Sequence, residues 1–431
     1  MKKFKILLLV LIMIFAFSGC SSFRLSTSID DLISPVSPSG ENDAVKTAVE
    51  QYCKNGYLIK IPSSGEYTTS FIFYDLNNDG ENEAIAFYEP SDKLGTIDMA
   101  VLNKQDDNWK VVYNVTGNGT DVNSVDFCDV NNDGEIEILV CWSLISKSTN
   151  FNLDVYRQIS DDSGYSLEPI GDSVTAGEFI CADVNEDGVT DVLVFSFGSS
   201  TLSPTARLYS YSSNSRKLIG ETKLDGSINS FSSIVVGETD QGVSVYADAV
   251  RSDGDSMVTE LIYWSNYYDS IVSPFYSYST GRTSDTARQS MIDSKDIDGD
   301  GVIEIPTDAK RSKLPQHLTA QDWMVYGNTV LTHKCYTVSC KRDSYSVVLS
   351  KKQLEDYTFK YDVNTRKLIV YDGKNMQFEI VTVFKSAYDS QNYSGYSEIY
   401  SNNGFVYLAK TGSNYESDIT VNDLKNIIKP Y

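Results

Sequence analysis

The chain has 431 residues and a formal net charge of −23 at pH 7, from 59 Asp and Glu against 36 Lys and Arg. This acidity disfavours nucleic acid and other polyanions as partners, because phosphate binding depends on clustered cations. The seven cysteines include no CxxC pair, so the sequence gives no sign of a zinc or redox centre.

The first twenty residues have the pattern of an export signal. Three lysines within residues 2–5 precede an apolar run, residues 6–17, which is too short for an ordinary membrane-spanning helix. Ser18 and Gly19 then stand before Cys20, and this arrangement resembles a bacterial lipobox, with Phe17 where an aliphatic residue is usual. The resemblance implies a signal peptide over residues 1–19, cleavage before Cys20 and a lipid on its sulfur. A plain secretory signal is the alternative.

The segment after the signal is rich in Ser, Pro and Asp, which predicts a lipidated cysteine and tether over residues 20–43. Asp43 is placed to cap a short helix that follows. The apolar positions of this helix are Val45, Ala48, Val49 and Tyr52. We expect the protein at the extracellular face of the cell membrane, held there by its lipid anchor alone.

A nine-residue pattern occurs four times along the chain, in residues 75–83, 129–137, 183–191 and 296–304. It has Asp at position 1, Asn or Asp at 3, Asp at 5, Gly at 6, and Asp or Glu at 9. In a tightly wound loop, side-chain oxygens at alternate positions converge on one cation, and the carbonyl of position 7 adds a ligand. An all-oxygen ligand set suits Ca²⁺ better than zinc or copper. The sequence therefore predicts about four structural calcium ions.

The predicted metal ligands are the residues at positions 1, 3, 5, 7 and 9 of each loop. They are Asp75, Asn77, Asp79, Glu81 and Glu83; Asp129, Asn131, Asp133, Glu135 and Glu137; Asp183, Asn185, Asp187, Val189 and Asp191; and Asp296, Asp298, Asp300, Val302 and Glu304.

The spacing of the loops indicates a repeat. Asp79, Asp133 and Asp187 are successively 54 residues apart, and a further 53 residues lead to Asp240. The segment around Asp240 has no carboxylate at positions 1 and 9 of the pattern. We interpret it as a degenerate copy that has lost its ion.

An EF-hand is the competing interpretation of such loops. It needs a bidentate Glu at position 12 and a helix on either side. Position 12 is instead Ala86, Val140, Val194 and Thr307, and the flanks are short β-branched and aromatic runs such as residues 192–195. The pattern therefore favours loops between strands.

After the first loop, strand-like runs occupy residues 84–88, 96–102, 109–113 and 125–128, so each repeat has four strands and the loop joins its first and second strands. Tandem four-stranded units of this length are typical of propeller blades. With their Asp-x-Asx-x-Asp-Gly-x-x-Asp/Glu loops, these units resemble FG-GAP/VCBS repeats, the integrin-type calcium-loop blades, in an arrangement similar to VCBS-repeat lipoproteins of Gram-positive bacteria. The resemblance covers Cys20 and about residues 56–340. It implies a mainly-β calcium-binding β-propeller of four-stranded blades and says little about activity.

The repeat fades after Pro306. We predict a propeller with its N-terminal helix over residues 44–340 and a small α+β domain over residues 341–431. In the latter, strand-like runs precede a capped helix over residues 420–428 that ends near Pro430. Five blades are preferred, and seven are the alternative because the chain from Asn55 to its end accommodates about seven repeats.

No nucleophile elbow, P-loop, zinc-protease or dinucleotide motif occurs in the sequence. We therefore expect no catalytic residues and no enzymatic activity, but a monomer that binds or scaffolds an extracellular glycan or protein. The alternative is a secreted carbohydrate-active enzyme, a glycoside hydrolase or polysaccharide lyase, because paired carboxylates carry no local signature.

Overall fold

The computed structural model describes residues 39–144, 149–161, 164–199, 202–311, 313–411 and 419–430. The predicted signal peptide, the lipidation site Cys20 and the tether up to residue 38 lie outside the described residues. Strands make up 54% and helices 10% of the described residues, so the mainly-β prediction is confirmed.

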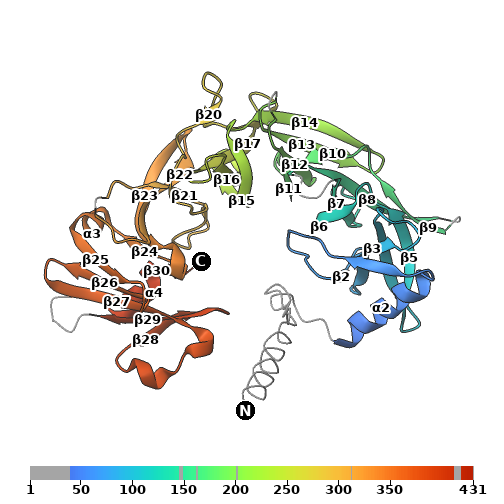
Figure 1. Cartoon of the computed structure of the whole chain (residues 1–431). Helices are drawn as coiled ribbons and strands as arrows, with labels where there is room; N and C mark the ends of the chain where they lie inside the picture. The colour runs from blue at the N-terminus through green and yellow to red at the C-terminus, as the bar shows by residue number, and fades with distance from the viewer. Residues whose placement is uncertain are drawn as a thin grey trace, which may run out of the picture.

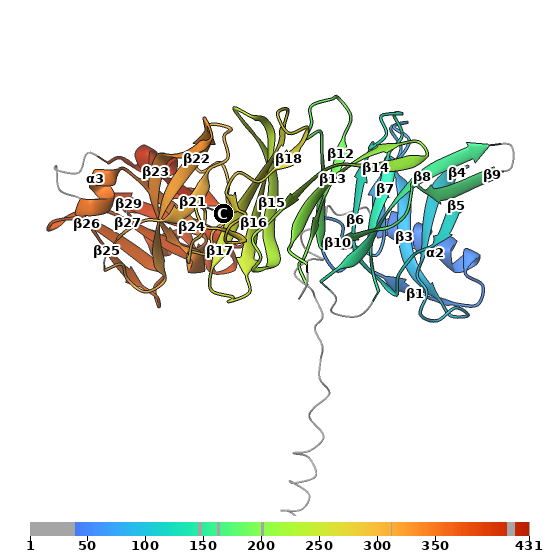
Figure 2. The ribbon, with the colours of Figure 1, turned by 90° about the horizontal axis from the view of Figure 1, so that it is seen from above.

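Most strands lie in six antiparallel sheets of four or five strands, which we number sheet 1 to sheet 6 in chain order. The sheets follow one another along an open arc (Figure 1) and stand in a single row when seen from above (Figure 2). No closed barrel or propeller is detected among the described residues. Sheet 6 lies within the predicted C-terminal domain, and the other five sheets hold strands between Tyr57 and Leu349 together with Ile428–Pro430.

The N-terminal helix α2 (Ser39–Tyr52) packs against sheet 1 through Val45 and Val49, both 0% exposed. The predicted start after Asp43 is wrong. Asp43 lies inside the helix, where its carbonyl accepts a hydrogen bond from the Thr47 hydroxyl (2.8 Å), and Glu41 in the first turn supplies the favourable negative charge. Tyr52, predicted as an apolar contact, is half exposed.

The first three sheets share a meander of four strands, each paired with its neighbour in sequence, and sheets 1 and 2 each carry one additional strand. Sheet 1 comprises β1 (Tyr57–Lys60), β2 (Ile72–Tyr74), β3 (Glu83–Pro90), β4 (Asp98–Gln105) and β5 (Asn108–Thr116). Sheet 2 comprises β6 (Asp121–Cys128), β7 (Glu137–Ser143), β8 (Phe151–Asp161), β9 (Gly164–Pro169) and β10 (Val174–Ala176). Sheet 3 comprises β11 (Glu178–Ala182), β12 (Asp191–Ser196), β13 (Thr205–Ser212) and β14 (Ser215–Lys223). The predicted position of the loop, between the first and second strands of its unit, is confirmed at β2–β3, β6–β7 and β11–β12. It is wrong for the fourth loop, which is closed by the isolated bridge between Lys295 and Glu304 and precedes the first strand of its sheet, β21 (Ile305–Asp308).

Sheet 4 has the same meander but no intact copy of the nine-residue pattern. It comprises β15 (Ile228–Thr239), β16 (Gly242–Arg251), β17 (Met257–Ser265) and β18 (Ser270–Val272). Thr239 pairs directly with Gly242, so the degenerate copy around Asp240 is a tight turn at the expected place. A separate hairpin, β19 (Tyr276–Ser277) and β20 (Arg282–Thr283), follows the sheet.

Sheets 5 and 6 complete the arc. Sheet 5 comprises β21 (Ile305–Asp308), β22 (Leu318–Gly327), β23 (Val330–Cys340), β24 (Tyr345–Leu349) and β30 (Ile428–Pro430). Sheet 6 comprises β25 (Tyr357–Asp362), β26 (Lys367–Asp372), β27 (Asn375–Phe384), β29 (Phe405–Thr411) and β28 (Ser397–Ser401). The helices α3 (Lys351–Asp356) and α4 (Val421–Ile427) accompany them. The Thr420 cap of α4 is confirmed by its capping box with Asp423, although Ile428 belongs to β30 and not to the helix.

Apolar side chains hold each sheet to the next. Trp142 of sheet 2 packs with Phe87 of sheet 1, and Phe195 of sheet 3 lies in one cluster with Ile262 of sheet 4. Because the central strands are covered on both faces, they are continuous buried runs, as in residues 84–88, and do not alternate with polar residues. One cluster crosses from sheet 5 to sheet 6, and β23 pairs with β24, so the predicted boundary between residues 340 and 341 falls inside one sheet and one core.

Candidate metal centres

The four predicted loops share one local structure, built by their position-1 aspartates. Asp75 accepts hydrogen bonds from the amides of Asp79 (3.1 Å) and Gly80 (2.9 Å). The equivalent pair recurs at 3.3 and 3.0 Å for Asp129, 3.0 and 2.9 Å for Asp183, and 3.1 and 2.8 Å for Asp296. These hydrogen bonds make the backbone turn tightly around the carboxylate. The same residue types therefore fold into the same loop four times.

The glycine at position 6 is required by its backbone angle. Its φ lies between 87° and 91° in all four loops, a region that side-chain-bearing residues rarely adopt. The aspartate at position 5 then accepts a hydrogen bond from the amide of position 7, at 2.8 Å for Asp79, 3.0 Å for Asp133, 2.9 Å for Asp187 and 3.0 Å for Asp300. Position 7 is Glu81, Glu135, Val189 or Val302, and its amide is already used in this bond.

The ninth position closes each loop with a buried carboxylate. Glu83, Glu137, Asp191 and Glu304 are 0–4% exposed, and the first three are the first residues of β3, β7 and β12. A glutamate here reaches back to the amide of position 2, at 2.9 Å from Leu76, 3.0 Å from Val130 and 2.9 Å from Ile297.

Asp191 is one methylene shorter than these glutamates. Both of its oxygens are buried and accept no hydrogen bond of good geometry, although the backbone amides of Asn185 and Val184 lie close enough to lower its pKa; one oxygen of Glu304 also lacks a donor. Burial, together with neighbouring carboxylates, raises the pKa of Glu137, Asp191 and Glu304 to about 7. A buried carboxylate without a donor is costly unless a cation offsets its charge.

The fourth loop brings three predicted ligands together. One oxygen from each of Asp296, Asp298 and Glu304 lies within 4.8 Å of the others, a group that could hold a metal ion. Within the described residues no other such group of three is found: position 3 is asparagine in the first three loops, and their carboxylates at positions 1, 5 and 9 do not all come within this distance of one another. Lys334 of β23 forms ion pairs with Asp298 (3.3 Å) and Asp300, so part of the positive charge at this loop comes from the protein itself.

The asparagines at position 3 take two orientations. The Asn77 and Asn185 amides each donate to the aspartate at position 5, at 3.0 Å. The Asn131 amide donates to Glu137 (2.6 Å), and its buried carbonyl oxygen has no donor. The orphaned oxygens of Asn131, Asp191 and Glu304 fit an oxygen-ligated cation; the geometry by itself does not select the metal.

Neighbouring loops contact one another through position 4. The Asn78 side chain donates to the carbonyl of Gly134 in the second loop (2.7 Å). Glu186 of the third loop accepts from the amide of Val243, next to the degenerate turn of sheet 4 (2.9 Å). Asp240 of that turn accepts from the Asn328 amide in sheet 5 (2.6 Å). The loops and turns are therefore linked from sheet to sheet along one side of the arc.

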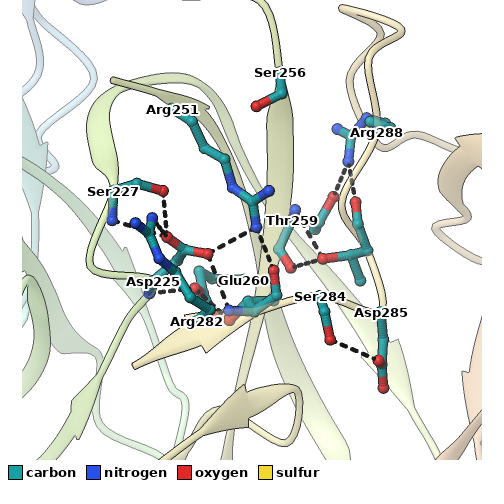
Figure 3. Close-up of polar contacts among 12 residues, drawn as sticks. Asp225, Ser227, Arg251, Ser256, Thr259, Glu260, Arg282, Ser284, Asp285 and Arg288 are labelled. Atoms are coloured by element: carbon teal, nitrogen blue, oxygen red, sulfur yellow. Dashed lines mark hydrogen bonds and ion pairs between the residues drawn. The ribbon is translucent and has the colours of Figure 1, made fainter. Parts of the chain in front are cut away.

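A second polar cluster lies at the other end of sheet 4 and was not predicted. It centres on Asp225, Arg251 and Arg282 (Figure 3), which come from three separate segments. No local spacing marks it in the sequence. The sequence shows only two arginines close to predicted turns in an acidic chain. Arginines in such positions are too common to indicate a site.

No protein-family model and no curated protein matches this chain. Among the described residues, no helix has the length and apolar character needed to cross a membrane.

Proposed function

We propose that this protein is an extracellular calcium-binding lipoprotein that binds or scaffolds a glycan or protein and is not an enzyme. The observation that carries the proposal is the repeated loop, with its shared Asp turn and a buried ninth carboxylate whose charge needs a cation. Calcium is the metal that an all-oxygen ligand set of this kind prefers.

The six sheets would then be blades of an FG-GAP/VCBS-type propeller that is open in this chain. This assignment is supported by the meander topology, by the loop between first and second strands, and by the apolar cluster between each sheet and the next. The bound ion would supply positive charge where the loop gathers carboxylates. The side chains of positions 1, 3, 5 and 9 and the carbonyl of position 7 would hold it.

A metal count tests the calcium assignment. The dialysed protein should contain about four Ca²⁺ per chain after loading, because four loops keep all of the predicted ligands. A count of two or fewer would show that several loops are only turns.

The location rests on Cys20, which lies outside the described residues. The wild-type protein should partition with membranes into detergent, and Cys20→Ser should be released or remain unprocessed. A variant that stays membrane-bound at the mature mass would contradict the lipid anchor.

Incubation with a panel of cell-wall and plant polysaccharides separates the binding protein from the enzyme. Retention without cleavage supports the proposal, whereas new reducing ends would favour the alternative of a carbohydrate-active enzyme.

A further inference from the structure

A pocket of about 540 Å³ lies at the end of sheet 4 opposite to the degenerate turn. Arg251 and Arg282 line it together with Asp253 and the hydroxyl side chains of Ser227, Ser252 and Ser284. Arg251 comes from the end of β16 and Arg282 from the hairpin β19–β20, which folds back over the start of sheet 4, where the Gly226 amide donates to the carbonyl of Gly281 (3.0 Å).

Asp225 holds the two guanidinium groups side by side. Its side chain is 0% exposed and accepts from Arg251 Nη2 (2.8 Å) and from Arg282 Nη1 (3.1 Å). The same carboxylate accepts from the Ser227 amide (2.8 Å) and hydroxyl (2.5 Å) and from the Thr283 amide (3.0 Å). Burial raises the pKa of Asp225, but these hydrogen bonds and Arg251 outweigh it and the pKa is lowered, so the carboxylate stays ionised.

A deeper layer fixes Asp225 in turn. Glu260 is fully buried and accepts from the Asp225 amide (2.7 Å), the Thr283 hydroxyl (2.8 Å) and the Ser273 hydroxyl (2.8 Å). Arg251 Nη2 also donates to the carbonyl of Thr283. Asp225, itself fixed by Glu260, therefore positions both guanidinium groups from the buried side of the pocket.

Several donors of these arginines remain free. Nη1 of Arg251, and Nε and Nη2 of Arg282, form no hydrogen bond to any residue that the structure describes. The Arg282 side chain is 52% exposed and that of Arg251 18%. Both residues line the pocket, and both guanidinium groups bind the same carboxylate.

Arg288, in the same region, shows what a purely structural arginine looks like here (Figure 3). Its side chain is 0% exposed, and its three nitrogens donate to Asp248 (2.6 Å), to Thr259 (2.9 Å), and to the carbonyls of Ile292 (2.9 Å) and Thr286 (3.1 Å). All of its nitrogens are used inside the fold. Arg251 and Arg282 differ from it, because some nitrogens of each guanidinium group form no hydrogen bond to a described residue.

The charge of the pocket is balanced. Asp225 below and Asp253 at the rim offset the two guanidinium charges, in a chain whose net charge is −23. An anion would therefore be held here by directed donors and not by a positive field. Paired guanidinium forks of this kind match the planar oxygens of carboxylates and the oxygens of sulfate.

We propose that this pocket binds an oxyanion group, a carboxylate or a sulfate ester, carried by an acidic extracellular glycan; its directed donors act locally against the negative charge that disfavours polyanions over the chain as a whole. The inference rests on the proposed binding function and names the ligand class. The neighbouring serine hydroxyls can bond to sugar hydroxyls. The exposed Tyr278 at the tip of the same hairpin, 5.0 Å from Tyr276 between ring centroids, offers an apolar face.

The test uses the full chain in detergent with two matched probe pairs. Oligogalacturonate is compared with its methyl ester, which removes the charge and keeps the sugar, and dextran sulfate is compared with dextran. Titration calorimetry should show binding of at least one charged probe and at least about tenfold weaker binding of its neutral partner, because charged hydrogen bonds are the strong ones. Preference for oligogalacturonate identifies a carboxylate site, and preference for dextran sulfate a sulfate site.

Three variants assign the binding to this pocket. Arg282→Gln should lower the affinity for the charged probe at least about tenfold, and Arg282→Lys should fall between it and the wild type because a lysine keeps the charge and loses the fork. Arg207→Gln is the matched control, since Arg207 pairs with Glu221 on sheet 3 and should bind like the wild type. Melting curves check that all three fold.

The inference is overturned if neither charged probe binds, if the neutral partners bind equally well, or if Arg282→Gln binds like Arg207→Gln. Its failure is distinct from failure of the proposed function. Glycan retention that persists in Arg282→Gln would leave the binding role intact and remove only this pocket. A calcium count near zero would remove the calcium assignment without touching the pocket.

Discussion

Among the four carboxylates at position 9, that of Asp191 has the fewest hydrogen bonds to offset its buried negative charge. This carboxylate is fully buried and accepts no hydrogen bond of good geometry; Asp187 and Asp183 nearby add negative charge, which the amides of Asn185 and Val184 offset only in part. The glutamates at the equivalent positions relieve part of this cost by accepting a backbone amide. A side chain shortened by one methylene is thus held less well by the loop amides, and most of its negative charge is left uncompensated.

Asp191→Asn should therefore change stability in opposite directions with and without calcium. In chelator, the variant should be more stable than the wild type by about 1 kcal/mol or more, because a neutral amide replaces an unpaired buried carboxylate. In millimolar calcium it should be less stable than the wild type, because the loop has lost a charged ligand. Thermal melts in the two buffers measure both effects.

Asp372→Asn is the control, since Asp372 is exposed at the end of β26 and far from any loop in sequence. Its melting temperature should follow the wild type in both buffers. Equal destabilisation of Asp191→Asn with and without calcium would instead assign Asp191 a packing role.

At the scale of elements, the loops also make contacts between neighbouring sheets. Glu186 accepts the amide of Val243 in the next sheet, and a Cβ added at Gly242 would lie 2.5 Å from its carboxylate. Gly242, with φ of 99°, is therefore the residue that lets Glu186 approach. The third loop and the turn of sheet 4 form one contact, although only the loop keeps the metal pattern.

Glu186→Ala should weaken this contact between sheets 3 and 4. The expected loss is about 1 kcal/mol of unfolding free energy in chemical denaturation, the usual contribution of one hydrogen bond to a charged acceptor in a partly exposed place. Glu186→Gln keeps an acceptor oxygen and should lose less. If both variants unfold at the wild-type midpoint, the contact contributes nothing to the docking of the two sheets.

The elements that could be predicted are those that repeat. The loops carry five fixed positions each, and the strands around them are apolar runs bounded by turns, so the runs predicted at residues 84–88, 96–102, 109–113 and 125–128 are confirmed as β3, β4, β5 and β6. The same holds for the strand-like runs at residues 345–349, 357–361 and 367–371, which are β24, β25 and β26.

What the sequence did not show is how elements without the pattern combine. Sheet 6 has no metal loop, so its strands were assigned to a separate domain, whereas Tyr407 on β29 and Tyr345 on β24 lie in one core. The strand β30 was missed because three residues after a helix give no periodic signal, and its place depends on pairing with β24, more than seventy residues earlier. The pocket around Asp225 was missed for the same reason, since its members meet only in the fold.

At the scale of the whole molecule, the described chain is a row of sheets joined face to face, each resting on the next through an apolar cluster. An open arc of this kind has no closing contact between its first and last sheets to add stability. Hydrogen bonds between loops and turns add contacts of this kind between sheets 1 and 2, sheets 3 and 4, and sheets 4 and 5.

Removing calcium should therefore lower the stability of the entire described fold and not only of single loops. With free Ca²⁺ at ten times the dissociation constant, each site adds about 1.4 kcal/mol to the unfolding free energy. Four such sites would be comparable with a common domain's margin of about 5–15 kcal/mol. The wild-type melting temperature should rise steadily with calcium concentration, and magnesium should do much less because it demands a smaller, octahedral ligand shell. Differential scanning calorimetry in chelator, in magnesium and in millimolar calcium measures this directly. A midpoint that does not move between chelator and calcium would remove the structural role from all four loops at once, whatever the metal count shows.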